Sequence, residues 1–206
     1  NLVLRNIAFV VLISLLLIFF QRFIFTISLQ IFDLSSDTTT SFQEYFNIRV
    51  YSSFGELTIY VITGLFIGLQ KTKISSIVVG FFSITNIIFS LFFVLYFNMN
   101  VEGVAYGTLV ASTVTTIIFL FYTFNYLSKI TSLEINVRDV FNVKKIQSIF
   151  NINFNIFIRT ILLTFSFLYF TYLGNSISED VVAANTILLN LTMLSAFILD
   201  AYAFST

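Results

Sequence analysis

Residues 74–101 read ISSIVVGFFSITNIIFSLFFVLYFNMNV and contain no Asp, Glu, Lys or Arg. Further runs without these residues occupy 103–128, 160–178 and 181–199. A bilayer core about 30 Å thick is crossed by about 20 apolar helical residues, each rising about 1.5 Å. Backbone polar groups in lipid must be satisfied within the protein, which favours helices. The runs therefore predict an all-α, polytopic membrane protein.

The composition of the whole chain supports this prediction. Of 206 residues, 58% are hydrophobic and 10% are charged, with a mean hydropathy of +0.97, whereas soluble domains carry about 25% charged residues. The net charge is zero, so no basic surface indicates a nucleic-acid partner. Cys and His are absent, which removes disulfides, thiolate or imidazole metal sites and Ser-His or Cys-His dyads. We therefore expect neither an enzyme nor a bound cofactor.

The hydropathy pattern predicts six membrane-spanning segments. They occupy residues 6–32, 45–70, 75–97, 103–128, 154–174 and 181–206. The longest connection, 129–150, has scattered apolar and charged residues that suit a short interfacial amphipathic helix. Both ends of the sequence look cut, because it opens without Met and stops inside an apolar run. We therefore expect a fragment of a longer protein.

Charge alternates between successive connections, which predicts a topology. Three connections are acidic and contain no basic residue; they hold Asp33, Asp37 and Glu44, then Glu102, then Glu179 and Asp180. The others are basic, and they hold Lys71 and Lys73, then Lys129, Arg138, Lys144 and Lys145, while Arg5 precedes the first segment. By the positive-inside rule the basic connections are cytoplasmic, so the first segment runs from inside to outside.

Polar residues form stripes on the third and fourth segments. Helical spacing places on one face of each segment Ser83, Asn86 and Ser90, and Thr108, Ser112 and Thr115, respectively. Such stripes either make interhelical hydrogen bonds, worth about 0.6 kcal/mol per pair, or face a ligand or ion. A second pattern on the fourth segment, Gly103, Gly107 and Ala111, predicts a seam of close helix packing.

Ionisable residues inside spans are costly, at about 2.5 to 3.5 kcal/mol each for Asp, Lys or Arg at the centre. Glu56 lies near the middle of the second segment, and Arg49 lies seven residues earlier on the same face, about 10 Å away along the axis. An ion pair between them needs a stretched Arg side chain. Otherwise Glu56 is protonated, and it then has either a functional role or only a hydrogen bond to a neighbouring residue. For Arg22, Arg159 and Asp200, interface placement and a role in a transport pathway both remain open.

Several short pieces of the chain, in order and with their spacing, resemble the multidrug and toxic compound extrusion (MATE) family, and within it the branch of the DNA-damage-inducible protein F. They are 46–49 with 52–53, 64–70, 85–88, 100–105, 158–160, 183–189 and 196–200. The resemblance covers nearly the whole chain. It implies a transporter of twelve helices in two lobes, of which this chain supplies the third to the eighth.

The resemblance also implies a domain division and a cation site. Residues 1–128 would be the last four helices of the N-terminal lobe, 129–150 the cytoplasmic linker, and 151–206 the first two helices of the C-terminal lobe. In prokaryotic members the fifth helix offers an Asn and, four residues later, an Asp, joined by a Thr on the sixth helix and an Asp on the first. Asn86 and Thr108 look like that Asn and Thr, whereas Ser90 stands at the Asp position.

The substitution at position 90 bears on the coupling ion. A serine can offer an oxygen to sodium but cannot take up a proton near neutral pH, and Glu56 is the residue that could supply the missing carboxylate. A second departure is Phe54, where the family usually has Pro, so we expect a weaker kink there.

The function that follows from the resemblance is sodium- or proton-coupled antiport across the bacterial inner membrane. A monomer would export small organic, often cationic, compounds by alternating access. Residues expected along the substrate pathway are Arg49, Arg159, Asn185 and Asp200. Two alternatives remain: a lipid-linked oligosaccharide flippase, which would use Arg22, Arg49 and Arg159 to attract pyrophosphate, and an inactive membrane scaffold.

Overall fold

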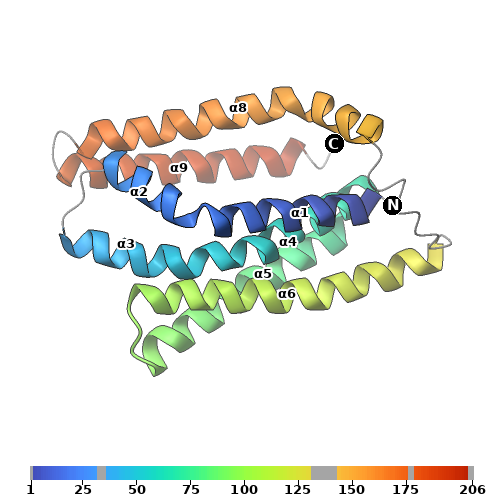
Figure 1. Cartoon of the computed structure of the whole chain (residues 1–206), viewed down its shortest axis with the longest axis horizontal. Helices are drawn as coiled ribbons and strands as arrows, with labels where there is room; N and C mark the ends of the chain where they lie inside the picture. Colours follow the sequence, from blue (N-terminus) through green and yellow to red (C-terminus); the bar gives the residue numbers. More distant parts are fainter. Residues whose placement is uncertain (1, 32–35, 131–142, 176–178, 204–206) are drawn as a thin grey trace. The chain divides into compact units, whose positions relative to one another are not determined.

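The computed structural model of the chain describes residues 2–31, 36–130, 143–175 and 179–203. The regular secondary structure in these ranges is entirely helical (Figure 1). The elements are α1 Leu2–Phe19, α2 Gln21–Ile31, α3 Ser36–Arg49, the 3₁₀ turn η1 Val50–Ser52, α4 Ser53–Gly68, α5 Thr72–Leu91, the π-helical turn η2 Phe92–Tyr96, α6 Val101–Ile130, α8 Val143–Asn175 and α9 Glu179–Ala203. The predicted all-α fold class is confirmed.

The helices of the described part include five stretches long and apolar enough to cross a bilayer. They are Leu2–Phe19, Thr38–Gly68, Thr72–Tyr96, Val101–Ile130 and Phe154–Gly174. In α9 the apolar stretch Val181–Phe197 is shorter. Large apolar side chains on these helices are exposed, such as Ile84, Ile87 and Ile88 on α5. An exposed apolar surface of this kind suits lipid, and the chain is a polytopic membrane protein.

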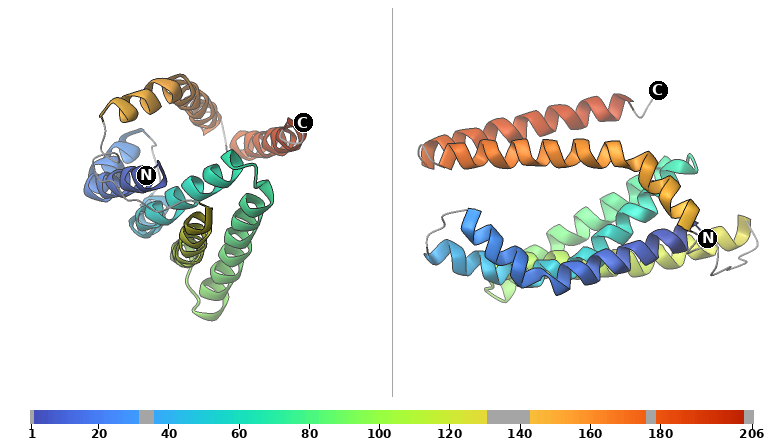
Figure 2. Two further views of the ribbon diagram at one scale, coloured as in Figure 1. Left: turned by 90° about the vertical axis from the view of Figure 1, so that its right-hand side faces the viewer. Right: turned by 45° about the horizontal axis from the view of Figure 1, so that its top comes forward.

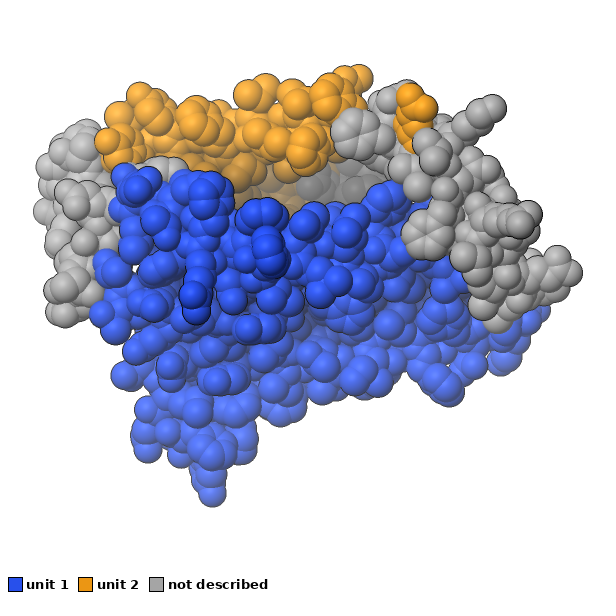
Figure 3. All heavy atoms as spheres, viewed as in Figure 1, with its two compact units in different colours: residues 1–142 blue, residues 143–206 orange. Residues whose placement is uncertain are grey.

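The chain divides into two compact units, residues 1–142 and 143–206 (Figure 3). The division falls inside the range 129–150 that the sequence identifies as a linker. Residues 131–142, where an interfacial amphipathic helix is predicted, lie outside the described residues. The pair Lys144 and Lys145 belongs to the first turn of α8.

In the first unit, successive spans run in opposite directions, while α2 continues the direction of α1 and α4 that of α3 (Figure 1). Figure 1 shows that α1 begins, α4 ends and α6 ends toward one end of the unit, while α2 ends and α6 begins toward the other. The turn with Lys71 and Lys73 and the residue Lys129 therefore share an end with the start of α1. This arrangement is what a protein with alternating acidic and basic connections requires.

The core of the first unit lies between α4, α5 and α6, which are neighbours in both views of Figure 2. Its buried members are Ile59, Ile62, Phe66, Val78 and Phe119. Aromatic side chains pack edge to face in this core. The ring centroids of Phe66 and Tyr126 are 5.5 Å apart, and those of Phe81 and Phe119 are 5.6 Å apart. This packing fixes α5 and α6 against each other, and their polar stripes meet in that interface.

Several predicted boundaries were wrong. The first segment is broken at Phe20, which separates α1 from α2. The expected connection 33–44 is shorter, because α3 already begins at Ser36. Ser and Asp are favoured at helix starts, so a polar stretch can belong to a helix end as well as to a loop. A 3₁₀ turn, Val50–Ser52, also stands just before Phe54, so the second span is irregular without a proline.

In the second unit α8 packs against α9. The contact is close at Gly174, where an added Cβ would come within 2.7 Å of Asn185 Nδ2. The sequence predicts a segment at 154–174, whereas α8 is a longer helix that starts at Val143. Its exposed face carries apolar residues such as Phe165 and Leu168.

Candidate functional site

The backbones of α5 and α6 touch where Ser90 faces Gly107. A Cβ added to Gly107 would lie 2.6 Å from both the Cα and the backbone N of Ser90. At Gly103, an added Cβ would lie 3.2 Å from the backbone N of Val94, in the π-helical turn that directly follows α5. Ala111 continues the same seam and is fully buried. The predicted small-residue packing seam is confirmed, and it brings the polar residues of the two helices within reach of each other.

Asn86, Ser90 and Thr108 form one hydrogen-bonded cluster in this interface. The Ser90 hydroxyl donates to Asn86 Oδ1 at 3.0 Å, and Asn86 Nδ2 lies 3.4 Å from Thr108 Oγ1. Thr108 in turn donates to the backbone carbonyl of Val104 at 3.1 Å. Thr108 is buried, while Asn86 and Ser90 are half-buried. The structure thus unites three of the sequence-predicted site residues.

The rest of the stripe on α6 serves a different contact. Ser112 and Thr115 are fully buried. Ser112 packs on Gly55 of α4, where an added Cβ would lie 2.8 Å from Ser112 Cβ, and Thr116 donates to the Gly55 carbonyl at 2.9 Å. Ser83, the first residue of the stripe on α5, is exposed. Each predicted stripe is therefore divided, and only one turn of each contributes to the cluster.

The cluster offers neutral oxygens and no carboxylate. Hard cations bind such oxygen atoms, and the available ones are Asn86 Oδ1, Ser90 Oγ and Thr108 Oγ1. None of these groups gains or loses a proton near neutral pH. Within the described ranges, no set of three or more Asp, Glu, His and Cys side chains is placed to hold a metal ion. The cluster makes the interhelical hydrogen bond between Asn86 and Thr108, and its oxygens are of the kind that can bind a cation.

Glu56 belongs to a second polar cluster, with Arg49 and Ser52. Arg49 Nη2 donates to Glu56 Oε2 at 2.9 Å, and Arg49 Nη1 contacts both Glu56 Oε1 and Ser52 Oγ. Ser52 Oγ also lies 3.0 Å from Glu56 Oε1 and 2.6 Å from the carbonyl oxygen of Arg49, and its one proton can serve either acceptor. The stretched ion pair that the sequence left open is thus formed.

This second cluster opens into a groove of about 360 Å³ between α1, α2, α3 and α4. The groove is otherwise mainly apolar, with walls that include Ile13, Leu17 and Ile24. Among the described residues no hydrogen bond joins Glu56 to Asn86 or Thr108. The structure therefore places Glu56 apart from the cluster between α5 and α6.

The remaining pathway residues are dispersed. Arg159 is exposed on α8, and no described acidic residue pairs with it. Asn185 is half-buried on α9 and covers Gly174. Asp200 belongs to α9, but its side chain lies outside the described residues. Arg22, which the flippase alternative needs, is exposed on α2.

Two residues of these sites escaped the sequence reasoning. Ser52 completes the ion-pair cluster, and its spacing of four from Glu56 could have indicated this contact. Thr116 anchors α6 to the backbone of α4 across 61 positions of sequence, and no local signal predicts such a bond.

Comparison with known proteins finds a distant relative. The chain is similar to DNA damage-inducible protein F of Escherichia coli strain K12, with 26% identity over 163 residues. The similarity covers 79% of this chain and 35% of that protein, so the chain spans about a third of the relative's length. No protein-family model matches the chain, and no solved structure does either.

Proposed function

We propose that this chain is part of a MATE-type membrane transporter that exports small organic compounds by alternating access, driven by cation entry. Support comes from the resemblance of its motifs to that family and from its similarity to DNA damage-inducible protein F. The observation that carries the proposal is the cluster of Asn86, Ser90 and Thr108 between α5 and α6. This cluster brings the residues at positions 86, 90 and 108, which the resemblance links to a cation site, into hydrogen-bonding contact.

Sodium is the coupling ion that this cluster favours. A proton-coupled site needs a group that titrates in the physiological range, whereas amide and hydroxyl groups do not. Sodium instead replaces water ligands with oxygens such as those of Asn86, Ser90 and Thr108. Binding needs only that the Ser90 hydroxyl turn its proton away from Asn86 Oδ1, which is a rotation about one bond.

Coupling follows if cation and substrate favour different conformations. A ligand shifts a conformational equilibrium only by its differential affinity for the two states. In the proposed cycle sodium stabilises the state in which α5 and α6 close around the cluster, and the organic substrate stabilises the other state. The expected pathway residues Arg49, Arg159, Asn185 and Asp200 would contact substrate, and the basic connections would face the cytoplasm.

The proposal is tested by ethidium efflux from cells that express the full-length protein. Asn86→Leu keeps the side chain's approximate size but removes the oxygen, so we expect efflux to fall about tenfold, the effect of losing one good polar contact of about 1.4 kcal/mol. Ser83→Ala is the matched control, because Ser83 is exposed one turn earlier on the same helix. Absence of efflux from cells with the unaltered protein would contradict export and leave the flippase and scaffold alternatives.

A further inference from the structure

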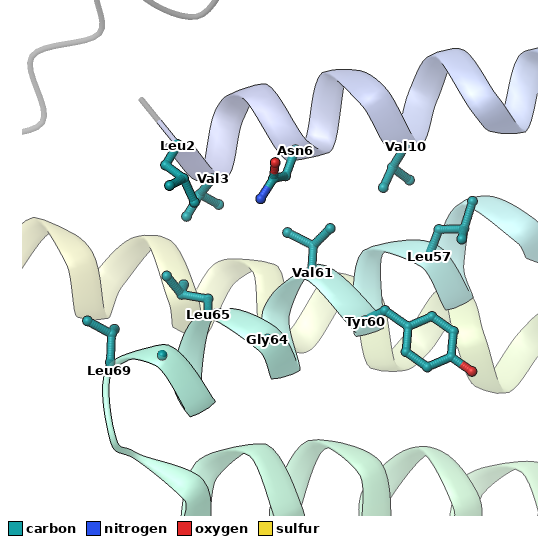
Figure 4. A pocket seen from close by; sticks show the side chains of 11 residues that line it. Leu2, Val3, Asn6, Val10, Leu57, Tyr60, Val61, Gly64, Leu65 and Leu69 are labelled. Carbon is teal, nitrogen blue, oxygen red and sulfur yellow. The ribbon is translucent and has the colours of Figure 1, made fainter. Parts of the chain in front are cut away.

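A second groove lies between α1 and α4, at the end of the first unit where the basic residues gather. Its volume is about 590 Å³. Figure 4 shows Val3, Asn6 and Val10 of α1 facing Val61 and Leu65 of α4 across it. Apart from Asn6 and Tyr60 its walls are apolar. The groove therefore suits an elongated hydrocarbon.

The dimensions of this groove match one leaflet of a bilayer. Along α4 and its C-cap the groove extends from Leu57 to Leu69, which is about 18 Å, and half of a bilayer core is about 15 Å. Its floor is open, because a Cβ added at Gly64 or at Gly68 would meet no atom within 4 Å. The space is thus continuous along one acyl-chain length, beginning at the helix end.

Positive charge stands where this groove begins. The α4 helix ends in a Schellman motif: Lys71 N–H donates to the Phe66 carbonyl at 2.7 Å and Gln70 N–H to that of Ile67 at 2.9 Å. This turn fixes Lys71 beside the groove residue Leu69, and Lys73 follows in the first turn of α5. Both lysines are exposed, and neither forms an ion pair with a described residue.

The acidic side chains that the structure describes in this unit lie elsewhere. Among its described side chains, Glu44 and Glu102 belong to the opposite end and Glu56 pairs with Arg49 in mid-span. Arg5 adds a positive charge in the first turns of α1. The side-chain amide of Asn6 makes no hydrogen bond within the described residues and points into the groove about one helical turn below its basic end (Figure 4). That is the depth at which a lipid's ester groups would lie.

We propose that this groove binds one anionic phospholipid, with an acyl chain between α1 and α4, the phosphate at Lys71 and Lys73, and an ester oxygen at Asn6. Clusters of basic residues at the membrane surface attract anionic lipid by about 1 kcal/mol per charge. The groove adds an apolar channel to that attraction, so one lipid is held at a defined place. This inference does not depend on the proposed transport function.

Native mass spectrometry of the purified protein tests the inference, with phosphatidylglycerol and phosphatidylcholine as probes. We expect one retained phosphatidylglycerol per chain in this groove. Lys71→Gln with Lys73→Gln should reduce the preference for phosphatidylglycerol over phosphatidylcholine about 25-fold, or about fivefold per lysine. Both lysines are exposed, so this variant leaves the helix packing intact.

Filling the groove gives a second, independent test. Gly64→Phe should abolish retention of the lipid, while Gly80→Phe on α5 should preserve it; an added Cβ meets open space at both glycines, so neither change begins with a clash. Equal retention of the two lipids, unaffected by the lysine changes, would overturn the proposal. So would lipid retention at the original level in Gly64→Phe, or displacement of the lipid by inorganic phosphate, which would show a site for free anions.

Discussion

Arg49 and Glu56 form a two-pronged ion pair across the 3₁₀ turn that joins α3 to α4, with Arg49 Nη2 2.9 Å from Glu56 Oε2. The turn Val50–Ser52 interrupts the regular helical hydrogen bonds, and the pair bridges it from one side to the other. Short 3₁₀ stretches inside helices often mark hinges. The ion pair therefore fixes the angle between two halves of one membrane span.

The first prediction concerns the stability that this pair provides. Arg49→Gln should lower the free energy of unfolding by about 1–3 kcal/mol, since it leaves a partly buried carboxylate without its charged partner. Glu56→Gln should cost a similar amount. The double variant should cost less than the sum of the two single changes, because they remove the same interaction. Denaturant unfolding in detergent measures all three, and strictly additive values would show that the pair contributes nothing.

The second prediction separates Glu56 from cation coupling. Glu56→Gln should leave the sodium concentration for half-maximal transport unchanged, because Glu56 bonds to Arg49 and Ser52 and not to the cluster around Asn86. Transport measured over a series of sodium concentrations gives this value. A large rise in this sodium concentration in the variant would show that Glu56 provides a carboxylate to the cation site.

The third prediction uses the contact of Gly107 with Ser90. Gly107→Ala places a methyl group 2.6 Å from the Ser90 backbone, so α5 and α6 must separate at a cost of about 1–3 kcal/mol. The cluster should loosen with them, and efflux should fall. Gly80→Ala is the matched control: its Cβ meets open space, and alanine should stabilise the helix by up to about 1 kcal/mol. Equal effects of the two changes would contradict the close approach.

The fourth prediction concerns the end of α4. Gln70 has a φ of 57°, a left-handed conformation that strains a residue with a side chain. Gln70→Gly should raise the free energy of unfolding by about 0.5–1 kcal/mol, since strain relief exceeds the added freedom of the unfolded chain. Leu69→Gly is the control, because Leu69 has a φ of −85° and gains nothing from glycine. Destabilisation by Gln70→Gly would rule out strain at this turn.

The membrane class could be predicted from the sequence because hydropathy acts over whole helices. In lipid, an uncharged run such as 74–101 satisfies its backbone hydrogen bonds by forming a helix. Helix spacing likewise brought Asn86 and Ser90 to one face, and the glycine at 107 indicated the close contact with the next helix. Patterns of this kind are local, with a period set by the helix itself.

Features that depend on contacts distant in sequence could not be predicted. No glycine or proline near Phe20 indicates the break between α1 and α2. The bond from Thr116 to the Gly55 carbonyl depends on how α4 and α6 cross. The sequence left the ion pair of Arg49 and Glu56 open, because the two residues are about 10 Å apart along the helix axis and the reach of their side chains decides whether they meet.

Transport by the full-length protein in proteoliposomes tests the central claim most directly. An inward sodium gradient, imposed at equal pH on both sides, should drive ethidium outward, and Asn86→Leu should reduce this response about tenfold while Ser83→Ala retains it. An outward ethidium flux driven by a pH gradient alone, without sodium, and insensitive to Asn86→Leu would contradict the assignment of the α5–α6 cluster as the cation site.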